Sequence, residues 1–177
     1  MPLSLLHPVA YHRRHEDELT IRRATADDAD ELTRLRLEMQ TELFAGDGRG
    51  AAPDEIVEHN RRYFREHLPV GDFVAFVAEV DGEIVGTSGI VVYRAPPTHG
   101  NPTGIEGYVM NMYTVPSYRG RGIATSLLDH LVEHVRELGG RRAWLRASDS
   151  GRPVYHRYGF RGDDPHYMLY PFPQRGL

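Results

Sequence analysis

Apolar positions follow two different periods along this chain, which predicts that helices and strands are mixed. From residue 123 to 138, apolar side chains recur every three or four positions, as on one face of an amphipathic helix, and Gly139 and Gly140 then end the pattern. Just before this helix, residues 108–115 are rich in aromatic and β-branched side chains, and Pro116 closes the run. A strand that leads directly into a long helix indicates an α/β fold.

The same patterns predict further elements nearer the N-terminus. Two apolar runs, 73–80 and 83–93, flank Asp81-Gly82, a dipeptide typical of tight hairpin turns. We expect residues 1–18, which lack periodicity, to form an arm, and residues 19–177 to form a single domain. The other expected elements are a strand at 19–24, a helix between the polar residues 25–28 and the glycines at 46–50, a helix at 53–67, a loop at 94–104, a strand at 143–147 and a short helix after it.

Composition and charge narrow the class of protein. A chain of 177 residues suits one domain with its own core, and a 40% hydrophobic share is that of a globular protein. No apolar run approaches the roughly 20 residues that span a bilayer, and the chain has no cysteine for disulfides or thiolate metal sites. The net charge of −4 argues against a nucleic-acid surface. We therefore expect a cytoplasmic protein that binds neither membrane nor nucleic acid.

The junction between the strand at 108–115 and the helix at 123–138 carries the most specific chemical signal. It reads Arg119-Gly120-Arg121-Gly122, and a helix start of this kind presents unpaired N–H groups at the positive end of the helix dipole. Glycines there let a phosphate approach the backbone. The stretch has no lysine for a nucleotide P-loop, and no acidic residue follows at a strand end as dinucleotide binding by a Rossmann fold requires. The pattern predicts a pyrophosphate site.

Two motifs resemble those of the Gcn5-related N-acetyltransferase (GNAT) superfamily. The sequence Arg119-x-x-Gly122-x-Ala124 is similar to that superfamily's coenzyme A pyrophosphate loop, and Val-Tyr-His-Arg-Tyr-Gly-Phe at 154–160 is similar to its late Tyr-x-x-x-Gly-Phe element. The resemblance covers roughly residues 20–170. It implies a mixed α/β fold whose twisted, mostly antiparallel sheet is splayed between its fourth and fifth strands and flanked by helices. It also implies acetyl-coenzyme A as the acyl donor.

The resemblance further implies where the cofactor binds. The pantetheine arm pairs with the fourth strand as an added strand would, the glycine loop holds the pyrophosphate through backbone N–H groups, and Ser148 stands where many members carry an Asn that contacts pantetheine. The residues expected at the cofactor are Met112, Tyr113, Thr114, Arg119, Gly120, Arg121, Gly122, Ile123, Ala124, Thr125 and Ser148.

The resemblance implies direct attack by a neutral amine on the thioester within a ternary complex. The backbone N–H of Met112 is expected to stabilise the oxyanion, and Tyr155 matches the superfamily's proton donor for the leaving thiolate. With a tyrosine pKa of about 10 and a thiol pKa of about 8.5, full proton transfer is uphill by about 2 kcal/mol. Tyr155 is therefore expected to hydrogen-bond the thiolate as much as to protonate it. The alternative for Tyr155 is a half-buried core aromatic.

The general base is left open by the sequence. Glu106 is either a base acting through water or a solvated charge at a strand end. Asn111 cannot take a proton but can position a substrate or a water. Glu38 and Glu42 share one helix face, where they either meet the amine or are simply exposed. A relay through ordered water needs no dedicated base.

The acceptor is expected to be a primary amine of a small molecule, in a groove built by the two N-terminal helices and the 94–105 loop. Acetylation of a protein N-terminus or lysine stays open, as do a non-catalytic coenzyme A sensor and an enzyme that uses another dinucleotide. No metal is expected, because the ten histidines show no ligand pattern such as His-Glu-x-x-His. An edge strand around 166–171 makes a homodimer conceivable.

Overall fold

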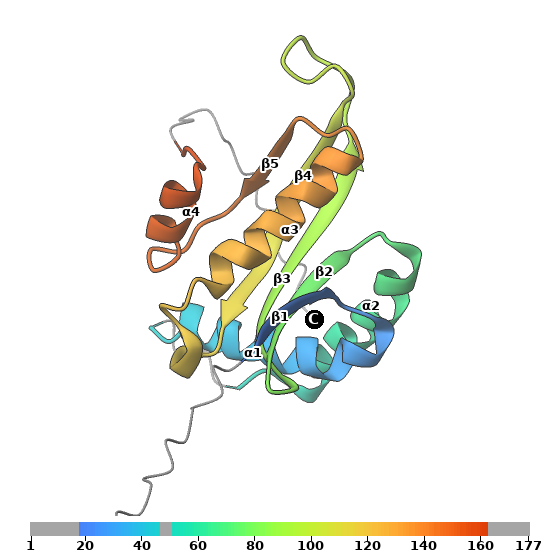
Figure 1. Ribbon diagram of the computed structural model, residues 1–177. Helices are drawn as coiled ribbons and strands as arrows, with labels where there is room; N and C mark the ends of the chain where they lie inside the picture. Colours follow the sequence, from blue (N-terminus) through green and yellow to red (C-terminus); the bar gives the residue numbers. More distant parts are fainter. Residues whose placement is uncertain (1–17, 47–50, 163–177) are drawn as a thin grey trace, which may run out of the picture.

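Five strands form one sheet that carries helices on both faces (Figure 1). The computed structural model describes residues 18–46 and 51–162. The strands follow one another across the sheet in chain order, and neighbours are antiparallel except for β4 and β5, which are parallel. This confirms the mixed, mostly antiparallel sheet that the family resemblance implied. The predicted N-terminal arm, apart from Glu18, and the edge strand around 166–171 lie outside the described residues.

The order of elements confirms the alternation read from the sequence. A 3₁₀ turn at Ala26–Asp28 precedes the first helix, and another at Pro116–Tyr118 follows β4. The strands are β1 (Leu19–Arg23), β2 (Val74–Val80), β3 (Glu83–Arg94), β4 (Ile105–Thr114) and β5 (Arg142–Leu145), and the helices are α1 (Ala29–Leu43), α2 (Asp54–Val70), α3 (Ile123–Glu137) and α4 (Arg152–Tyr158).

The β2–β3 hairpin has the turn that its sequence predicted. Asp81 and Gly82 have φ angles of 52° and 81°, so both central residues are left-handed. This geometry matches the right-handed twist of the flanking strands, and Asp-Gly is one of the few dipeptides that adopt it at low cost. The hairpin places β3 at the centre of the sheet, next to β4.

Helix α3 covers one face of the sheet with the leucines that the sequence pattern assigned to it. The side chains of Leu127, Leu128 and Leu131 are fully buried, and the helix contacts β2, β3 and β4. The helix ends at Glu137, so Leu138, which the pattern placed on the same face, lies beyond it and is 47% exposed. The helix therefore ends one residue earlier than the sequence pattern predicted.

Helices α1 and α2 cover the opposite face. Leu32 of α1 and Leu68 of α2 pack with Phe73 in one buried cluster. Helix α2 continues to Val70, beyond its predicted end, because Leu68 reaches this core and Gly71, with φ of 80°, closes the last turn in a left-handed conformation. The cluster fixes α2 beside α1 on this face of the sheet.

Strand β4 is irregular halfway along its length. Thr87 of β3 pairs with Tyr113, but Gly89 pairs with Met110, so β4 carries one residue more than its partner between these pairs. Asn111 lies in this bulge with φ of 54°, a left-handed conformation that asparagine tolerates better than most residues. The bulge bends β4 and turns its backbone groups away from the regular ladder.

Strands β4 and β5 separate after a short paired stretch. Their register runs from Glu106 opposite Arg142 to Val109 opposite Leu145, whereas β4 continues to Thr114. Beyond this stretch the chain of β5 leads to α4, which stands to one side of α3 in Figure 1. Among the described residues, the outer half of β4 therefore has no strand on its β5 side, which is the splay that the sequence resemblance implied.

Candidate active site

The turn between β4 and α3 has the backbone of an anion site. Gly120 and Gly122 have φ angles of 79° and 82°, and a Cβ atom added to either would meet no atom within 4 Å. Within the described residues, no acceptor binds the backbone N–H groups of Gly120, Gly122, Ile123 or Ala124. Unpaired N–H groups therefore gather at the positive end of the α3 dipole, with no side chain crowding the two glycines, as a bound pyrophosphate requires.

Two other residues of this turn make contacts within it. The Thr125 N–H donates to the carbonyl oxygen of Gly122 at 3.0 Å, so this predicted phosphate donor is already engaged in the first turn of α3. The guanidinium of Arg121 lies over the ring of Tyr118, 5.0 Å from its centroid. Stacking of this kind holds the Arg121 side chain against the 3₁₀ turn that leads into the loop.

Glu42 of α1 joins the glycine loop to β4. Its carboxylate accepts hydrogen bonds from the Tyr113 hydroxyl at 2.6 Å and from Arg119 Nη2 at 2.7 Å, while Arg119 Nε donates to the Thr114 carbonyl at 2.9 Å. Burial acts to raise the pKa of Glu42, but these hydrogen bonds outweigh it and lower the pKa. Burial and then the Glu42 carboxylate raise the pKa of Tyr113 to about 12. Glu42 is thus tied to two residues expected at the cofactor.

Tyr155 lies on α4 at the splayed edge of the sheet. Its ring packs edge-on against Phe160, with centroids 6.0 Å apart, and belongs to the cluster that also holds Leu145 of β5. A Cβ atom on Gly151 would come within 3.0 Å of this ring, so glycine there lets the ring approach the backbone. Burial raises the pKa of Tyr155. Its hydroxyl therefore stays protonated at neutral pH, and no partner for it is present among the described residues.

Tyr158, one turn later, has a different environment. Its hydroxyl donates to Asp129 of α3 at 2.8 Å, and burial together with this carboxylate raises its pKa to about 12. The bond ties α4 to α3. Tyr158 therefore has a visible structural task, and it offers a matched control for Tyr155.

Ser148 lies in the turn between β5 and α4. Its hydroxyl oxygen accepts a hydrogen bond from the Gly151 N–H at 3.1 Å and lies 3.2 Å from the Ser150 hydroxyl. Its carbonyl oxygen accepts from the Arg152 N–H at 2.9 Å. These contacts shape the start of α4 and hence the approach of Tyr155 to the splayed edge.

Glu106 is buried at the start of β4 rather than solvated. Its side chain is bound by Arg142 of β5, by the Tyr93 hydroxyl at 2.9 Å and by the Asn101 amide at 3.3 Å. The Arg142 guanidinium makes the largest contribution to a lowered pKa of Glu106. The carboxylate thus stays ionised inside a cluster at the end of the sheet where β4 and β5 are paired.

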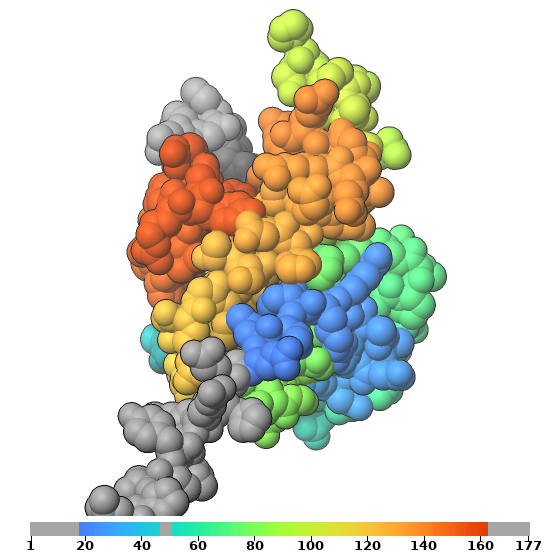
Figure 2. Space-filling model, in the orientation of Figure 1, coloured from blue at the N-terminus to red at the C-terminus, as the bar shows by residue number. Residues whose placement is uncertain are grey.

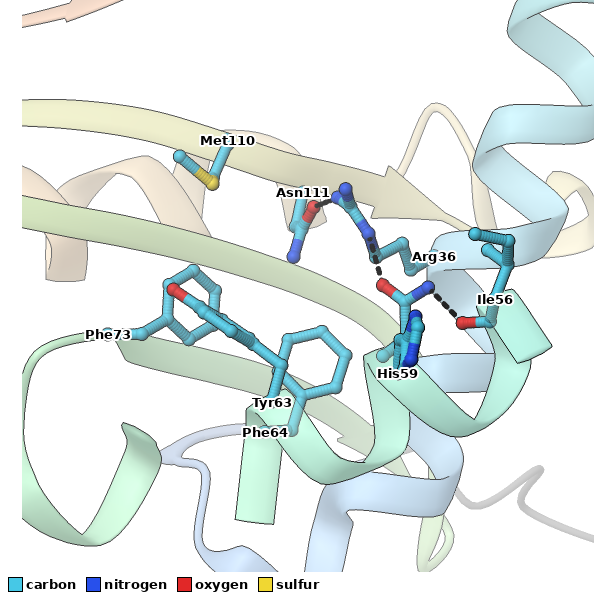
Figure 3. Close-up of a pocket in the computed structure, with 9 residues that line it drawn as sticks. Arg36, Ile56, His59, Tyr63, Phe64, Phe73, Met110 and Asn111 are labelled. Atoms are coloured by element: carbon cyan, nitrogen blue, oxygen red, sulfur yellow. Dashed lines mark hydrogen bonds between the residues drawn. The ribbon is translucent and has the colours of Figure 1, made fainter. Parts of the chain in front are cut away.

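A cavity of about 270 Å³ lies between α1, α2 and β4 (Figure 3). The Arg36 guanidinium crosses it, donating from Nε to the Asn60 side-chain oxygen at 2.7 Å and from Nη1 to the side-chain oxygen of Asn111. Asn111 was expected at the site from the sequence but Arg36 was not, because no local pattern distinguishes this arginine from the other arginines of the helix. The lining consists of Arg36, Ile56, His59, Asn60, Tyr63, Phe64, Phe73, Met110 and Asn111.

The 94–105 loop, which the sequence suggested as a wall of the acceptor groove, does not line this cavity. It projects from the far end of the β3–β4 ribbon, at the top of Figure 2 in yellow-green. Glu38 does not line the cavity either; it pairs with Arg34 on the exposed side of α1. The two N-terminal helices and β4 are thus the walls of this cavity.

In residues 18–46 and 51–162, no three His, Cys, Asp or Glu side chains gather as a metal site would need. None of the helices in these ranges is long and apolar enough to cross a membrane.

Comparison with known proteins identifies the family. The profile of the acetyltransferase (GNAT) family matches residues 37–160. A predicted acetyltransferase from Clostridium acetobutylicum, solved with acetyl-coenzyme A, is 36% identical with a TM-score of 0.76, and the match covers 86% of this chain and 96% of that one. A GCN5-related N-acetyltransferase from Ralstonia eutropha is 28% identical with a TM-score of 0.74, and its match covers 88% and 99% of the two chains.

A curated relative adds information on the class of reaction. An N-alpha-acetyltransferase of Sulfurisphaera tokodaii is 29% identical over an alignment of 147 positions, and the match covers 67% of this chain and 86% of that protein. The family match, these relatives, the splayed sheet and the unpaired glycine loop agree with one another. The chain belongs to the GNAT family and is an acetyl-coenzyme A-dependent N-acetyltransferase.

Proposed function

We propose that this enzyme acetylates the primary amine of a small molecule bound in the cavity between α1, α2 and β4. The observation that carries the proposal is the position of the cavity. Its lining includes Met110 and Asn111, at the β4 bulge, and these directly precede the β4 residues expected to hold pantetheine. An amine in this cavity therefore lies beside the strand segment along which the thioester would run.

The cofactor fits the features of the splayed edge. The pantetheine arm pairs with the backbone of Met112, Tyr113 and Thr114, on the side of β4 that β5 leaves open among the described residues. Its pyrophosphate binds the N–H groups of the glycine loop at residues 120–124. Arg119 supports this arrangement by fixing the loop to Glu42 and to the Thr114 carbonyl. Ser148 reaches pantetheine from the opposite side of the splay.

The reaction is a direct attack of the amine nitrogen on the thioester carbonyl. A C–N bond forms, the carbonyl oxygen becomes an oxyanion that accepts a hydrogen bond from the Met112 N–H, and the C–S bond then breaks. Tyr155 donates its hydroxyl hydrogen bond to the leaving thiolate, and the amine loses one proton. The raised pKa of Tyr155 keeps it a donor, although it also makes full proton transfer to sulfur less favourable.

The proton from the amine leaves through water in this proposal. The described residues that line the cavity include no aspartate or glutamate. Glu106, considered as a base from its sequence position, is instead occupied by Arg142, Tyr93 and Asn101. Asn111 holds Arg36 and lies at the bulge, so we assign it the positioning of the acceptor rather than proton transfer.

A protein N-terminus is the second candidate acceptor. The Sulfurisphaera tokodaii relative is an N-alpha-acetyltransferase, which favours this alternative. The cavity of about 270 Å³ favours a small molecule, because it holds a metabolite of amino-acid size. A cytoplasmic location and a homodimer stay as predictions from the sequence.

The test is acetyl transfer detected by mass spectrometry. Purified protein is mixed with acetyl-coenzyme A and pools of amines, amino acids, aminoglycosides and short peptides, with Tyr155→Phe and Tyr158→Phe in parallel. We expect an acetylated small molecule whose formation falls sharply in Tyr155→Phe and little in Tyr158→Phe. Binding of acetyl-coenzyme A without any product would instead support a coenzyme A sensor, and equal rates in both variants would refute the role of Tyr155.

A further inference from the structure

The cation in the acceptor cavity has no acidic partner. Arg36 is half-buried, and no carboxylate among the described residues forms an ion pair with it, whereas its helix neighbour Arg34 pairs with Glu31 and Glu38. Burial lowers the pKa of Arg36, as expected for a charge removed from water without an opposite charge beside it. A partly buried, uncompensated charge is costly for a fold, so its presence here indicates a ligand that supplies the missing anion.

The partners of Arg36 hold it in position rather than neutralise it. Its Nε and one Nη1 hydrogen are donated to the side-chain oxygens of Asn60 on α2 and Asn111 on β4, and the Asn60 amide donates in turn to the Ile56 carbonyl at 2.7 Å (Figure 3). A guanidinium has five N–H donors. Three of them have no acceptor in the described part of the chain, and a planar fork of this kind matches a carboxylate in bidentate geometry.

Apart from Arg36, His59, Asn60 and Asn111, the cavity lining is apolar and aromatic. The ring of Phe73 lies 5.6 Å from those of Tyr63 and Phe64, and Met110 of β4 packs against the same cluster (Figure 3). Phe73 has little freedom, because a Cβ atom on Gly89 would lie 2.2 Å from its ring. These rings form a fixed surface suited to an apolar side chain.

These three features match one class of acceptor. Resting on the function proposed above, we propose that the acceptor is a free α-amino acid with an apolar side chain, whose carboxylate binds Arg36. Its side chain lies against Phe73 and Tyr63, and its amine faces the bulge at Asn111. In an α-amino acid the amine and the carboxylate are attached to the same carbon, so they lie close together. This fits a site in which Asn111, at the end of the cavity nearest the expected thioester, also binds the Arg36 guanidinium. A peptide N-terminus lacks this carboxylate, since its carbonyl carbon is part of an amide bond.

A phosphate-bearing amine fits these features less well. Arg36 carries the only fixed positive charge among the described residues that line the cavity, and a phosphate dianion calls for more. The lining is otherwise dominated by apolar surface, which a sugar phosphate would not use. Glucosamine 6-phosphate, the acceptor named for a Trypanosoma brucei relative that is 28% identical, therefore serves as a contrasting substrate.

The test compares each acceptor with and without its carboxylate. Leucine, methionine and phenylalanine are each supplied as the free acid, as the primary amide and as the first residue of a dipeptide, and kcat/KM for acetyl transfer is measured by mass spectrometry. We expect the free acids to exceed their amides and dipeptides by at least about tenfold, the discrimination that one charged hydrogen-bonded pair provides. Glucosamine 6-phosphate is expected to react more slowly than the acids.

Arg36→Gln tests whether Arg36 binds the carboxylate of the acceptor, and Arg34→Gln on the same helix is the matched control. The first variant should reduce kcat/KM for the free acids about 10- to 100-fold more than for the amides, which abolishes the preference, while the second should keep the preference. If Arg36→Gln does not fold, the ratio of kcat/KM for the free acids to that for the amides in the wild-type enzyme still shows whether the carboxylate is recognised.

Three outcomes would contradict the inference. Amides or dipeptides that react as well as the acids would overturn the carboxylate contact while the acetyltransferase proposal stands. Faster transfer to glucosamine 6-phosphate would overturn the amino acid as acceptor. Absence of transfer to every amine in the wider pools would remove the proposed small-molecule function, and this inference with it.

Discussion

Replacing Gly122 by alanine tests the anion site at the start of α3. Gly122 has φ of 82° and a Cβ atom there meets no protein atom within 4 Å, so the fold suffers only the backbone cost of a left-handed alanine, about 1–2 kcal/mol. In a domain of this size that cost lowers Tm by about 2–8 °C. The added methyl group also occupies the open space before the unpaired N–H groups. Loss of one charged hydrogen bond to a pyrophosphate weakens acetyl-coenzyme A binding about 10- to 100-fold.

Gly71→Ala separates the two effects. Gly71 closes α2 with φ of 80°, and a Cβ atom there also meets nothing within 4 Å, so the backbone cost is the same at a site remote from the glycine loop. Thermal unfolding and calorimetric titration with acetyl-coenzyme A are measured for both variants. We expect similar losses of Tm but weaker binding in Gly122→Ala alone. Equal affinities in the two variants would refute the placement of the pyrophosphate.

Three further substitutions test other parts of the account. Gly151→Ala should lower kcat at least several-fold with little change in Tm, because its Cβ atom would come within 3.0 Å of the Tyr155 ring and displace it; an unchanged kcat would argue against Tyr155 as donor. Glu106→Gln should keep kcat within a few-fold, whereas loss of turnover would make Glu106 the base. The Glu106 pKa is lowered in the fold, chiefly by Arg142, so the ionised carboxylate stabilises the fold above the unfolded pKa of about 4.3, and this stabilisation is lost as pH falls through the folded pKa. Tm of Glu106→Gln should therefore depend less on pH below about 5 than Tm of the wild-type protein. The same pH dependence of Tm in both proteins would contradict this. Thr87→Val should raise Tm, since the buried Thr87 hydroxyl has no hydrogen-bond partner in the part of the chain that the structure describes, and a fall in Tm would show that this hydroxyl is satisfied.

Local patterns were sufficient to predict the strands, the hairpin and the glycine-bearing turn before α3, whereas the arrangement of the sheet was implied by the family resemblance. Asp81-Gly82 specifies its own turn, and the leucine period of α3 specifies its buried face, because both depend on neighbours in sequence. The end of α2 was predicted too early, since Leu68 gains burial only from the tertiary core. Helix propensity read from the sequence cannot show that Leu68 will be buried, so it cannot place the end of α2.

The cavity between α1, α2 and β4 could not be predicted, because it is assembled from distant segments. Arg36, Asn60 and Asn111 come from α1, α2 and the bulge of β4, and no local pattern marks them as neighbours. The setting of Glu106 was missed for the same reason: its partner Arg142 is brought opposite it by the parallel pairing of β4 with β5. Sites formed by side chains across elements need the tertiary structure.

The most direct test of the central claim follows the acetyl group itself. The enzyme is incubated with isotopically labelled acetyl-coenzyme A and an amine identified in the pools, and the masses of the intact protein and of the small molecules are recorded together. Direct attack predicts that the label appears on the amine in equal amount to the free coenzyme A released, with none on the protein. Label retained on the protein, or coenzyme A released without a labelled amine, would contradict acetyl transfer by direct attack in a ternary complex.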